Sequence, residues 1–186
     1  MRTASVHRTV VLLMLGTPCP AFELPGTDGH LHTLDEFGEA KLLVVIVSCN
    51  HCPYVVAYEE RMVALERDYR NKGVRLLAIN ANDTVRYPAD SMDKMVLRGR
   101  QRGFEFPYVR DDAQETVRAL GARFTPEVFV FDQARLLRYH GRIDDNYGDA
   151  SRVKRQDLRL ALDALLDGRL PEVAETSPIG CSVKWK

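Results

Sequence analysis

The chain has 186 residues, with 26 basic and 26 acidic side chains, 45% apolar residues and four cysteines, a composition close to that of an average globular protein. A formal charge of zero argues against nucleic acid or an anionic membrane as a partner, because both attract an excess of Lys and Arg. The strongest apolar run inside the domain, Leu42 to Val47, is far shorter than the roughly 20 residues that span a bilayer. We therefore predict a single domain over residues 1–186, with a core that needs neither disulfides nor a structural metal.

The N-terminus carries a short apolar run, Val10 to Leu15, preceded by the basic residues Arg2, His7 and Arg8. The run is shorter than the usual apolar part of a secretion signal, and no Ala-x-Ala-like cleavage site follows it. We therefore expect a first strand at this position and a cytoplasmic protein, whose cysteines lie in a reducing compartment.

Strand and helix patterns alternate after a hairpin that is predicted at the turn Thr27-Asp28-Gly29. Leu42 to Val47 is continuous and rich in β-branched residues, which is typical of a strand buried on both faces of a parallel sheet. After Pro53, apolar residues recur at gaps of three and four until Asn71-Lys72-Gly73, which predicts a long amphipathic helix. The further predicted elements are strands at 74–79, 107–110, 128–131 and 136–143, and helices at 91–102, 114–120 and 158–166. This alternation indicates an α/β fold with parallel crossovers, followed by an irregular tail.

Two cysteines, Cys49 and Cys52, lie between the predicted buried strand and the start of the next helix. A thiol at this turn faces unpaired backbone N–H groups and the positive end of the helix dipole, which favour a thiolate, and we expect the thiolate to be Cys49. His51, when cationic, adds a nearby positive charge. Cysteines at this spacing and place indicate a redox site. Zinc binding is the alternative, but zinc needs two more ligands at motif spacing, and Cys19 and Cys181 are single and distant.

Thr125-Pro126 stands directly before a predicted strand. The thiol pair at its turn, a following βαβ unit, this Thr-Pro, a β-hairpin and a last helix together resemble the thioredoxin fold over about residues 40–167. The resemblance implies a central mixed sheet flanked by helices. It also implies that Pro126 is cis and lies near Cys49, and that Thr125 and Pro126 bind the backbone of the substrate.

A closer resemblance, to the peroxiredoxin-like, TlpA-related branch of the thioredoxin family, rests on an N-terminal hairpin, an inserted helical segment at 83–106 and three sequence phrases. The phrases are Cys49-Asn50-His51-Cys52-Pro53-Tyr54-Val55, Gly141-Arg142-Ile143-Asp144-Asp145 and Gly180-Cys181-Ser182-Val183-Lys184-Trp185-Lys186. The resemblance divides the single domain into an N-terminal extension at 1–39, a core at about 40–167 and a C-terminal tail at 168–186.

The resemblance implies a thiol–disulfide oxidoreductase without a cofactor or resident metal, in which Cys49 attacks, Cys52 resolves and His51 assists. Its substrate is a disulfide-bearing protein or small molecule, and a thiol reductant resets the pair. A thiol peroxidase is the first alternative, and a non-catalytic binding module of the same fold is the second. The direction of exchange and the oligomeric state stay open.

Departures from the family pattern weigh on these alternatives. Thioredoxins have a Trp where this chain has Ser48, and a buried Asp that relays protons where it has Leu43. The helper base is therefore unidentified. Peroxiredoxins have a peroxide-binding Thr or Ser at the position of Ile46, and a Pro at that of Leu42, which argues against a dedicated peroxidase. Several relatives have a Cys at the position of Phe124.

The last predicted hairpin places further charged residues. With its turn centred on Gln133-Ala134, antiparallel pairing sets Gly141 about opposite Pro126. This register brings three charged residues toward the thiol end of the sheet, namely Arg142, Asp144 and Asp145. We predict that Arg142 takes part in substrate binding.

Four other residues complete the candidates. Asn80 and Asp83 follow the strand beside the central one, at the sheet edge where ligands of α/β proteins bind, and loop capping is their alternative role. Cys19, between two prolines, is expected to be structural. Cys181 in the tail is expected to be packed and inert; the alternative is an extra resolving thiol, if the tail folds over the site.

Overall fold

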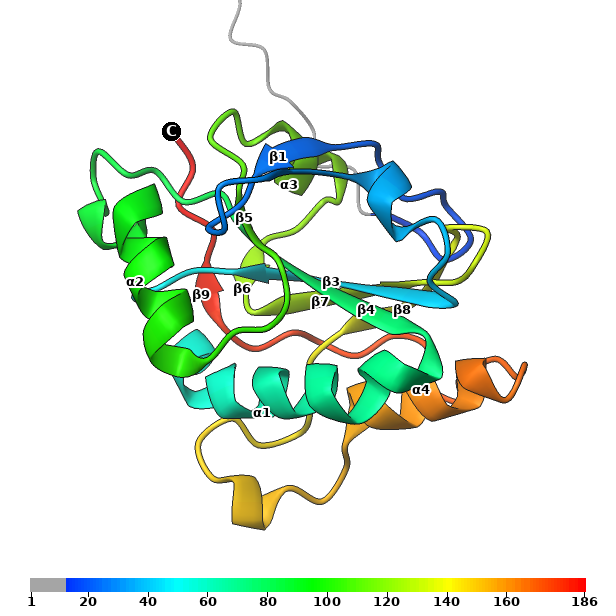
Figure 1. The fold of residues 1–186 in the computed structure, drawn as a ribbon. Coiled ribbons are helices and arrows are strands. Elements are labelled where there is room, and N and C mark those ends of the chain that lie inside the picture. The colour runs from blue at the N-terminus through cyan, green and yellow to red at the C-terminus, as the bar shows by residue number, and fades with distance from the viewer. Residues whose placement is uncertain (1–12) are drawn as a thin grey trace, which may run out of the picture.

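The computed structural model describes residues 13–186 and centres on a five-stranded mixed sheet in the order β5-β4-β3-β7-β8 (Figure 1). The central strand β3 (Leu42–Ser48) pairs in parallel with β4 (Val74–Asn80), which pairs in parallel with β5 (Tyr108–Arg110). On its other side β3 pairs antiparallel with β7 (Glu127–Phe131), and β7 pairs antiparallel with β8 (Leu137–Gly141). The predicted central strand therefore lies in the middle of the expected mixed sheet.

Three helices pack on one face of this sheet: α1 (Pro53–Tyr69), α2 (Met92–Arg102) and α4 (Asp157–Leu166). A short helix, α3 (Glu115–Ala119), packs on the other face. Figure 1 shows α1 and α4 below the sheet, with α3 and the N-terminal strands above it. Of the helices within residues 13–186, none is long and apolar enough to cross a bilayer.

Alternate residues of β3 enter two separate hydrophobic cores. Val44 and Ile46 lie in the core that contains Met62 of α1, whereas Leu43 and Val45 lie in the core under α3. Successive side chains of a strand point to opposite faces, so a strand that is covered on both sides must be apolar throughout. This explains the continuous apolar run, and every residue of β3 is buried.

Shorter elements connect and extend the central ones. The predicted N-terminal hairpin is present as β1 (Glu23–Pro25) paired with β2 (Leu31–Thr33). Four 3-10 helices lie in connections of the described chain: η1 (Leu34–Phe37), η2 (Arg70–Lys72), η3 (Pro88–Asp90) and η4 (Ala150–Arg152). The segment that contains η3 and α2 is the expected insertion, and α1 ends in η2 before Gly73, whose left-handed φ of 90° stops the helix.

The strand predicted at the N-terminal apolar run is not found where it can be examined. Residues 10–12 of that run lie outside the described residues, and residues 13–15 form no strand. Leu15 and Gly16 instead form a turn, with Gly16 in the left-handed region at a φ of 83°. Pro18 then makes an isolated bridge to Leu136.

The tail was predicted to be irregular, but it contains a strand. Its strand β9 (Cys181–Ser182) pairs antiparallel with β6 (Phe124–Thr125), just before Pro126. A strand of two residues is too short to show an alternating apolar pattern, so it cannot be predicted from the sequence.

The predicted register of the β7–β8 hairpin is also wrong. Gly141 lies opposite Val128 rather than Pro126, a shift of two residues. The ladder contains an irregularity between Val130 and Phe131, and the turn places Arg135 in the left-handed region at a φ of 59°. The pair Phe131–Leu137 centres the turn on Ala134, which accounts for one residue of the shift. The bulge adds one residue to a strand and displaces every pair beyond it by the other.

We predict that Met62→Ala lowers the free energy of unfolding by about 2–5 kcal/mol, because the Met62 side chain is fully buried between α1 and the sheet. The exposed Leu97→Ala in α2 is the control and should change it by no more than about 0.5 kcal/mol. Urea unfolding measures both. Equal losses in the two variants would contradict the packing of α1 on the sheet.

Candidate active site

The two cysteines of the predicted redox pair lie where β3 ends and α1 begins. Ser48 is the last residue of β3, Cys49 follows it, and Cys52 is the N-cap of α1 with extended backbone angles. Pro53 occupies the first helical position, where a missing N–H costs nothing and the fixed φ suits the helix. Both thiols therefore lie at the carboxyl edge of the central strand, and both residues are buried, with 2% of Cys49 and 0% of Cys52 exposed.

The Thr125-Pro126 segment packs against both thiols. Its peptide bond is cis, as the resemblance implies. Cys49 Sγ lies 3.5 Å from the Thr125 hydroxyl oxygen, and Cys52 Sγ lies 3.1 Å from the Thr125 carbonyl oxygen. Thr125 thus contacts two cysteines that precede it by 76 and 73 residues in the sequence.

The tail brings a third thiol to this point. β9 pairs Cys181 with Thr125, and Cys181 Sγ lies 2.7 Å from Cys52 Sγ. Cys181 is half-buried. The tail folds over the site, which is the condition under which Cys181 was considered as an extra resolving thiol.

Cys19 lies elsewhere, in the core under α3. Burial raises the pKa of its thiol to about 12, and its sulfur contacts only the carbonyl of the adjacent Pro20 among the described hydrogen-bonding groups. This environment agrees with the structural role expected for Cys19.

The two thiols of the reduced pair share one proton, and the pair loses its first proton below the ordinary thiol range. A hydrogen bond from the Cys49 thiol lowers the pKa of Cys52 well below its ordinary value, aided by the Cys181 thiol and by the backbone N–H groups of Val55 and Cys181. The same hydrogen bond, burial and the negative charge of Asp90 raise the pKa of Cys49. The expectation that Cys49 is the resting thiolate stays a prediction, because the Thr125 carbonyl oxygen, 3.1 Å from Cys52 Sγ, accepts a hydrogen bond only from a protonated Cys52.

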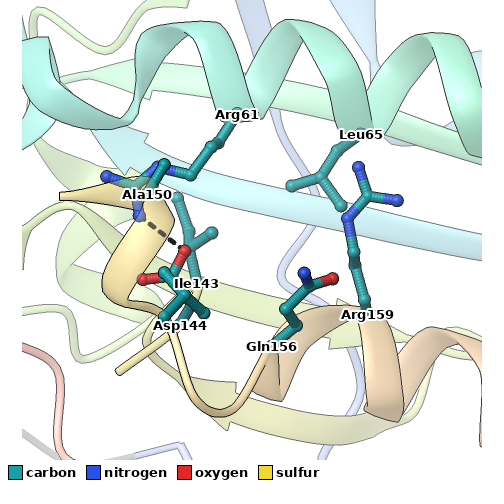
Figure 2. A pocket seen from close by; sticks show the side chains of 8 residues that line it. Arg61, Leu65, Ile143, Asp144, Ala150, Gln156 and Arg159 are labelled. Carbon is teal, nitrogen blue, oxygen red and sulfur yellow. Dashed lines mark hydrogen bonds and ion pairs between the residues drawn. The ribbon is translucent and has the colours of Figure 1, made fainter. Parts of the chain in front are cut away.

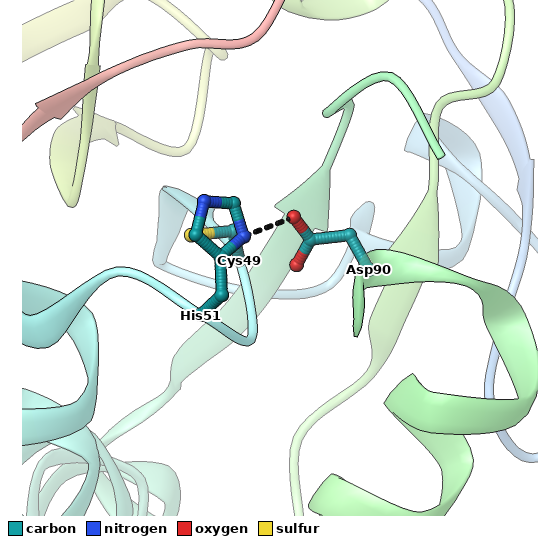
Figure 3. Close-up of side chains that lie close together, drawn as sticks. All are labelled: Cys49, His51 and Asp90. Carbon is teal, nitrogen blue, oxygen red and sulfur yellow. Dashed lines mark hydrogen bonds and ion pairs between the residues drawn. The ribbon is translucent and has the colours of Figure 1, made fainter. Parts of the chain in front are cut away.

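That carboxylate, Asp90 of η3, fixes the turn that carries the thiols. Asp90 is fully buried. One of its carboxylate oxygens lies 2.6 Å from His51 Nδ1 (Figure 3). The other accepts a hydrogen bond from the backbone N–H of Asn50 at 2.6 Å. The His51 ring is stacked on Tyr87, with 5.1 Å between ring centroids. Asp90 thus pairs with the predicted His51 and holds its orientation.

Side-chain amides complete the surroundings of Asp90. Asn80 Nδ2 donates to it at 3.2 Å and Asn82 Nδ2 at 2.9 Å. Asn80, a candidate from sequence, therefore supports the site indirectly, whereas Asp83 caps the backbone N–H of Val85 at 2.9 Å. Sequence reasoning missed Asp90. The sequence offers one indication of Asp90, namely that it follows β4, and the same is true of Asp83.

A second buried carboxylate, Glu127, fixes the loop before the cis bond. One of its oxygens accepts the backbone N–H groups of Arg123 at 2.7 Å and Phe124 at 2.8 Å, and the other lies 2.7 Å from His140 Nε2. These bonds hold the residues that precede Thr125, so Glu127 positions the group that contacts both thiols.

Three groups of the site could hold a metal ion. The ligand atoms of Cys49, His51 and Asp90 lie within 4.8 Å of one another, and thiolate, imidazole and carboxylate are all zinc ligands. His51 and Asp90 are hydrogen-bonded to each other, however, so ligation would require that bond to open.

Arg142 does not contact the thiols among the described interactions. Its Nε lies 2.7 Å from Asp157 of α4, which also pairs with Arg155 at 2.8 Å. Asp145 accepts the backbone N–H of Lys154 at 2.9 Å. Both residues thus join the segment after β8 to the region of α4, and the role of Arg142 in substrate binding stays a prediction.

Asp144 joins the same segment to α1. It lies 2.6 Å from Arg61 and accepts the Tyr58 hydroxyl at 3.0 Å. A pocket of about 380 Å³ beside this ion pair does not include the thiols, and Figure 2 shows its lining side chains between α1 and α4. They are Arg61, Leu65, Ile143, Asp144, Ala150, Val153, Gln156 and Arg159.

The chain is similar to one protein family and to solved structures of other proteins. The redoxin family model matches residues 14–156. A hypothetical protein from Sinorhizobium meliloti 1021 is 36% identical, with a TM-score of 0.89 over 94% of this chain and 96% of its own. An uncharacterized conserved protein from Geobacillus kaustophilus is 37% identical, with a TM-score of 0.89 over 94% of each chain.

More distant structures agree in fold. A thiol:disulfide interchange protein of the thioredoxin family from Chlorobium tepidum TLS is 20% identical, with a TM-score of 0.56 over 66% of this chain and 82% of its own. This likeness confirms the predicted thioredoxin fold. No curated protein matches the sequence.

We predict that Asp90→Asn lowers the free energy of unfolding by about 1–3 kcal/mol. The Asp90 carboxylate accepts hydrogen bonds with both oxygens, whereas the amide nitrogen of Asn would face N–H groups from which it cannot accept. The same change removes the charge that raises the pKa of Cys49, so the thiols should ionise at lower pH. Urea unfolding and the ultraviolet absorbance of the thiolate as a function of pH measure the two effects.

Asp93→Asn, at an exposed position in the first turn of α2, is the matched control and should change neither property. An unchanged thiol titration in Asp90→Asn would contradict the electrostatic role of Asp90, whatever happens to stability.

Proposed function

The chain belongs to the redoxin family, and from this premise we propose that it is a thiol–disulfide oxidoreductase whose redox pair is Cys49 and Cys52. Membership of the family and the thioredoxin fold make it a redox enzyme in general terms. The observation that carries the specific proposal is a pair of buried thiols at the N-terminus of α1, with Thr125 in contact with both.

We assign the attack on the substrate to Cys49, as the family resemblance implies; both thiols are buried, with 2% of Cys49 and 0% of Cys52 exposed. The two thiols share one proton, and its transfer to Cys52 places the negative charge on Cys49. Two groups of Thr125 favour the transferred state. Its carbonyl oxygen, 3.1 Å from Cys52 Sγ, accepts the new Cys52 proton, and its hydroxyl lies 3.5 Å from Cys49 Sγ.

The exchange then proceeds in two displacements. Cys49 thiolate attacks one sulfur of the substrate disulfide, and the other substrate sulfur leaves as a thiolate that takes up a proton. Cys52, deprotonated again, attacks Cys49 Sγ and releases the second substrate thiol. The substrate gains two electrons and two protons, and the pair becomes a disulfide.

The stabilised thiolate bears on the direction of exchange. Whatever stabilises the thiolate stabilises the reduced protein and raises its reduction potential, which makes the disulfide form more oxidising. A thiol reductant, as expected in the cytoplasm, returns the pair to the dithiol. The substrate is a disulfide-bearing protein or small molecule, and we place its backbone near Thr125, Pro126 and Arg142.

A thiol peroxidase is the second candidate, and one observation favours it. Peroxiredoxins have a peroxide-binding hydroxyl at the position of Ile46, and in this chain the Thr125 hydroxyl lies beside Cys49 instead. In this reaction peroxide oxidises Cys49 to a sulfenic acid, and Cys52 condenses with it, releasing water and forming the same disulfide. No arginine hydrogen-bonds to either thiol among the interactions within residues 13–186.

We predict that the wild-type protein reduces the disulfides of insulin, and that Cys52→Ser accumulates a mixed disulfide between Cys49 and insulin, because the resolving sulfur is missing. Mass spectrometry after acid quenching measures the adduct. Cys19→Ser is the control and should behave as wild type.

Three results would redirect the proposal. Absence of both insulin reduction and an adduct would reject disulfide exchange. Hydrogen peroxide consumption far faster than by a free thiol would favour the peroxidase. Stoichiometric zinc with both thiols protected from alkylation would favour a metal-binding module.

We also predict that the reduced pair is alkylated at a pH below the ordinary thiol range. The pKa of Cys52 is lowered, so the reactive charge is present at neutral pH and is lost only as acid protonates it. The reduction potential should lie above about −270 mV, the value for thioredoxin. An alkylation midpoint at or above about 8.5 would reject the activated thiolate.

A further inference from the structure

The redox pair has a third thiol in contact with it that the exchange reaction above does not use. Cys181 Sγ lies 2.7 Å from Cys52 Sγ, and a disulfide bond is about 2.05 Å long, so a small movement suffices to join them. Cys49, Cys52 and Cys181 form a cluster of their own, with Val55 and Tyr54.

The tail is held in this place on both sides of Cys181. At Gly180, a Cβ would lie 2.2 Å from the Thr125 carbonyl oxygen, so only glycine permits this approach. On the other side, the buried Val183 donates its N–H to the Arg123 carbonyl at 2.9 Å. The position of Cys181 is therefore built into the fold.

Further contacts anchor the end of the tail. Asn82 Oδ1 accepts the Lys184 backbone N–H at 2.8 Å, and the Asp83 N–H donates to the Lys184 carbonyl at 2.8 Å. The Arg118 guanidinium lies 4.1 Å from the centre of the Trp185 ring. Asn82 also donates to Asp90, so the tail and the thiol turn share a supporting residue.

Cys181 differs from the other two thiols in access and in protonation. It is half-buried, whereas 2% of Cys49 and 0% of Cys52 are exposed. Burial and the hydrogen bond to Cys52 raise the pKa of Cys181 to about 11, so it carries a proton when Cys52 is charged. An external thiol therefore reaches Cys181 more readily than it reaches either member of the pair.

We propose that Cys181 is a third redox thiol, which takes over the disulfide of the Cys49–Cys52 pair and presents it as a Cys52–Cys181 disulfide to an external dithiol reductant. This inference rests on the proposed function, since it needs a Cys49–Cys52 disulfide as its starting point.

The transfer is an internal exchange without net oxidation. The Cys181 sulfur attacks Cys52 Sγ, the Cys49–Cys52 bond breaks, and Cys49 takes up the proton that Cys181 loses. The dithiol reductant then attacks Cys181 Sγ, and Cys52 leaves as the stabilised thiolate. The second thiol of the reductant displaces Cys181, which leaves with a proton, and the reductant becomes a disulfide.

The geometric part of the proposal is tested without any substrate. Full-length Cys49→Ser, oxidised with diamide and digested without reductant, should give a Cys52–Cys181 linked peptide in mass spectrometry. Cys49→Ser combined with Cys181→Ser should give none. Absence of the link in folded Cys49→Ser would overturn the proposal.

The kinetic part uses the complete protein. Cys181→Ser should retain a single turnover with insulin, which needs only the pair. Its re-reduction by dithiothreitol should be roughly tenfold slower or more, because an intramolecular step at high effective concentration is lost. Ser182→Ala, at an exposed position on the same strand, is the matched control and should match wild type.

The two proposals fail differently. Loss of single-turnover insulin reduction in the wild type would reject the proposed function. Normal single turnover with unchanged re-reduction in Cys181→Ser would overturn the role of Cys181 alone.

Discussion

The negative charge that the Cys49–Cys52 pair shares, buried at the start of α1, is the constraint on which the site depends. Removing a charge from water is costly unless donors replace the lost hydration. Here the backbone N–H groups of Val55 and Cys181 face the pair, and the Cys181 thiol lies in contact with Cys52. A second buried charge, on Asp90, lies close by and is balanced by its own donors, among them His51. The hydrogen bonds to Asp90 are therefore needed to keep this carboxylate charged beside the thiols.

The fold supplies these donors from segments that meet at one edge of the sheet. The turn after β3 carries the pair, η3 carries Asp90, the loop before β7 carries Thr125, and β9 carries Cys181. Each segment is itself fixed by buried polar contacts, such as those of Glu127 to the backbone before Thr125. The precision of the site therefore comes from the connections, while β3 and α1 supply its rigid base.

Sequence patterns predicted the elements that local physics determines. The apolar run of β3, the periodicity of α1 and the glycine that ends it each depend on neighbouring residues, and each was predicted correctly. The register of β7 and β8 was wrong by two residues, because the turn is centred on Ala134 and because a bulge leaves no pattern in the sequence; each accounts for one residue. The cis form of Pro126 was expected only through the family resemblance, since an isolated Thr-Pro is far more often trans.

The sequence by itself determined that the chain is an α/β protein with two cysteines at a strand-to-helix turn, because spacing and periodicity act over a few residues. Only the tertiary structure decided which groups surround those cysteines. Asp90 is 39 residues from His51 and Cys181 is 129 residues from Cys52, so neither contact follows from local spacing. It also decided how the pKa values of the two thiols are shifted, because each shift is a sum over groups from distant parts of the chain.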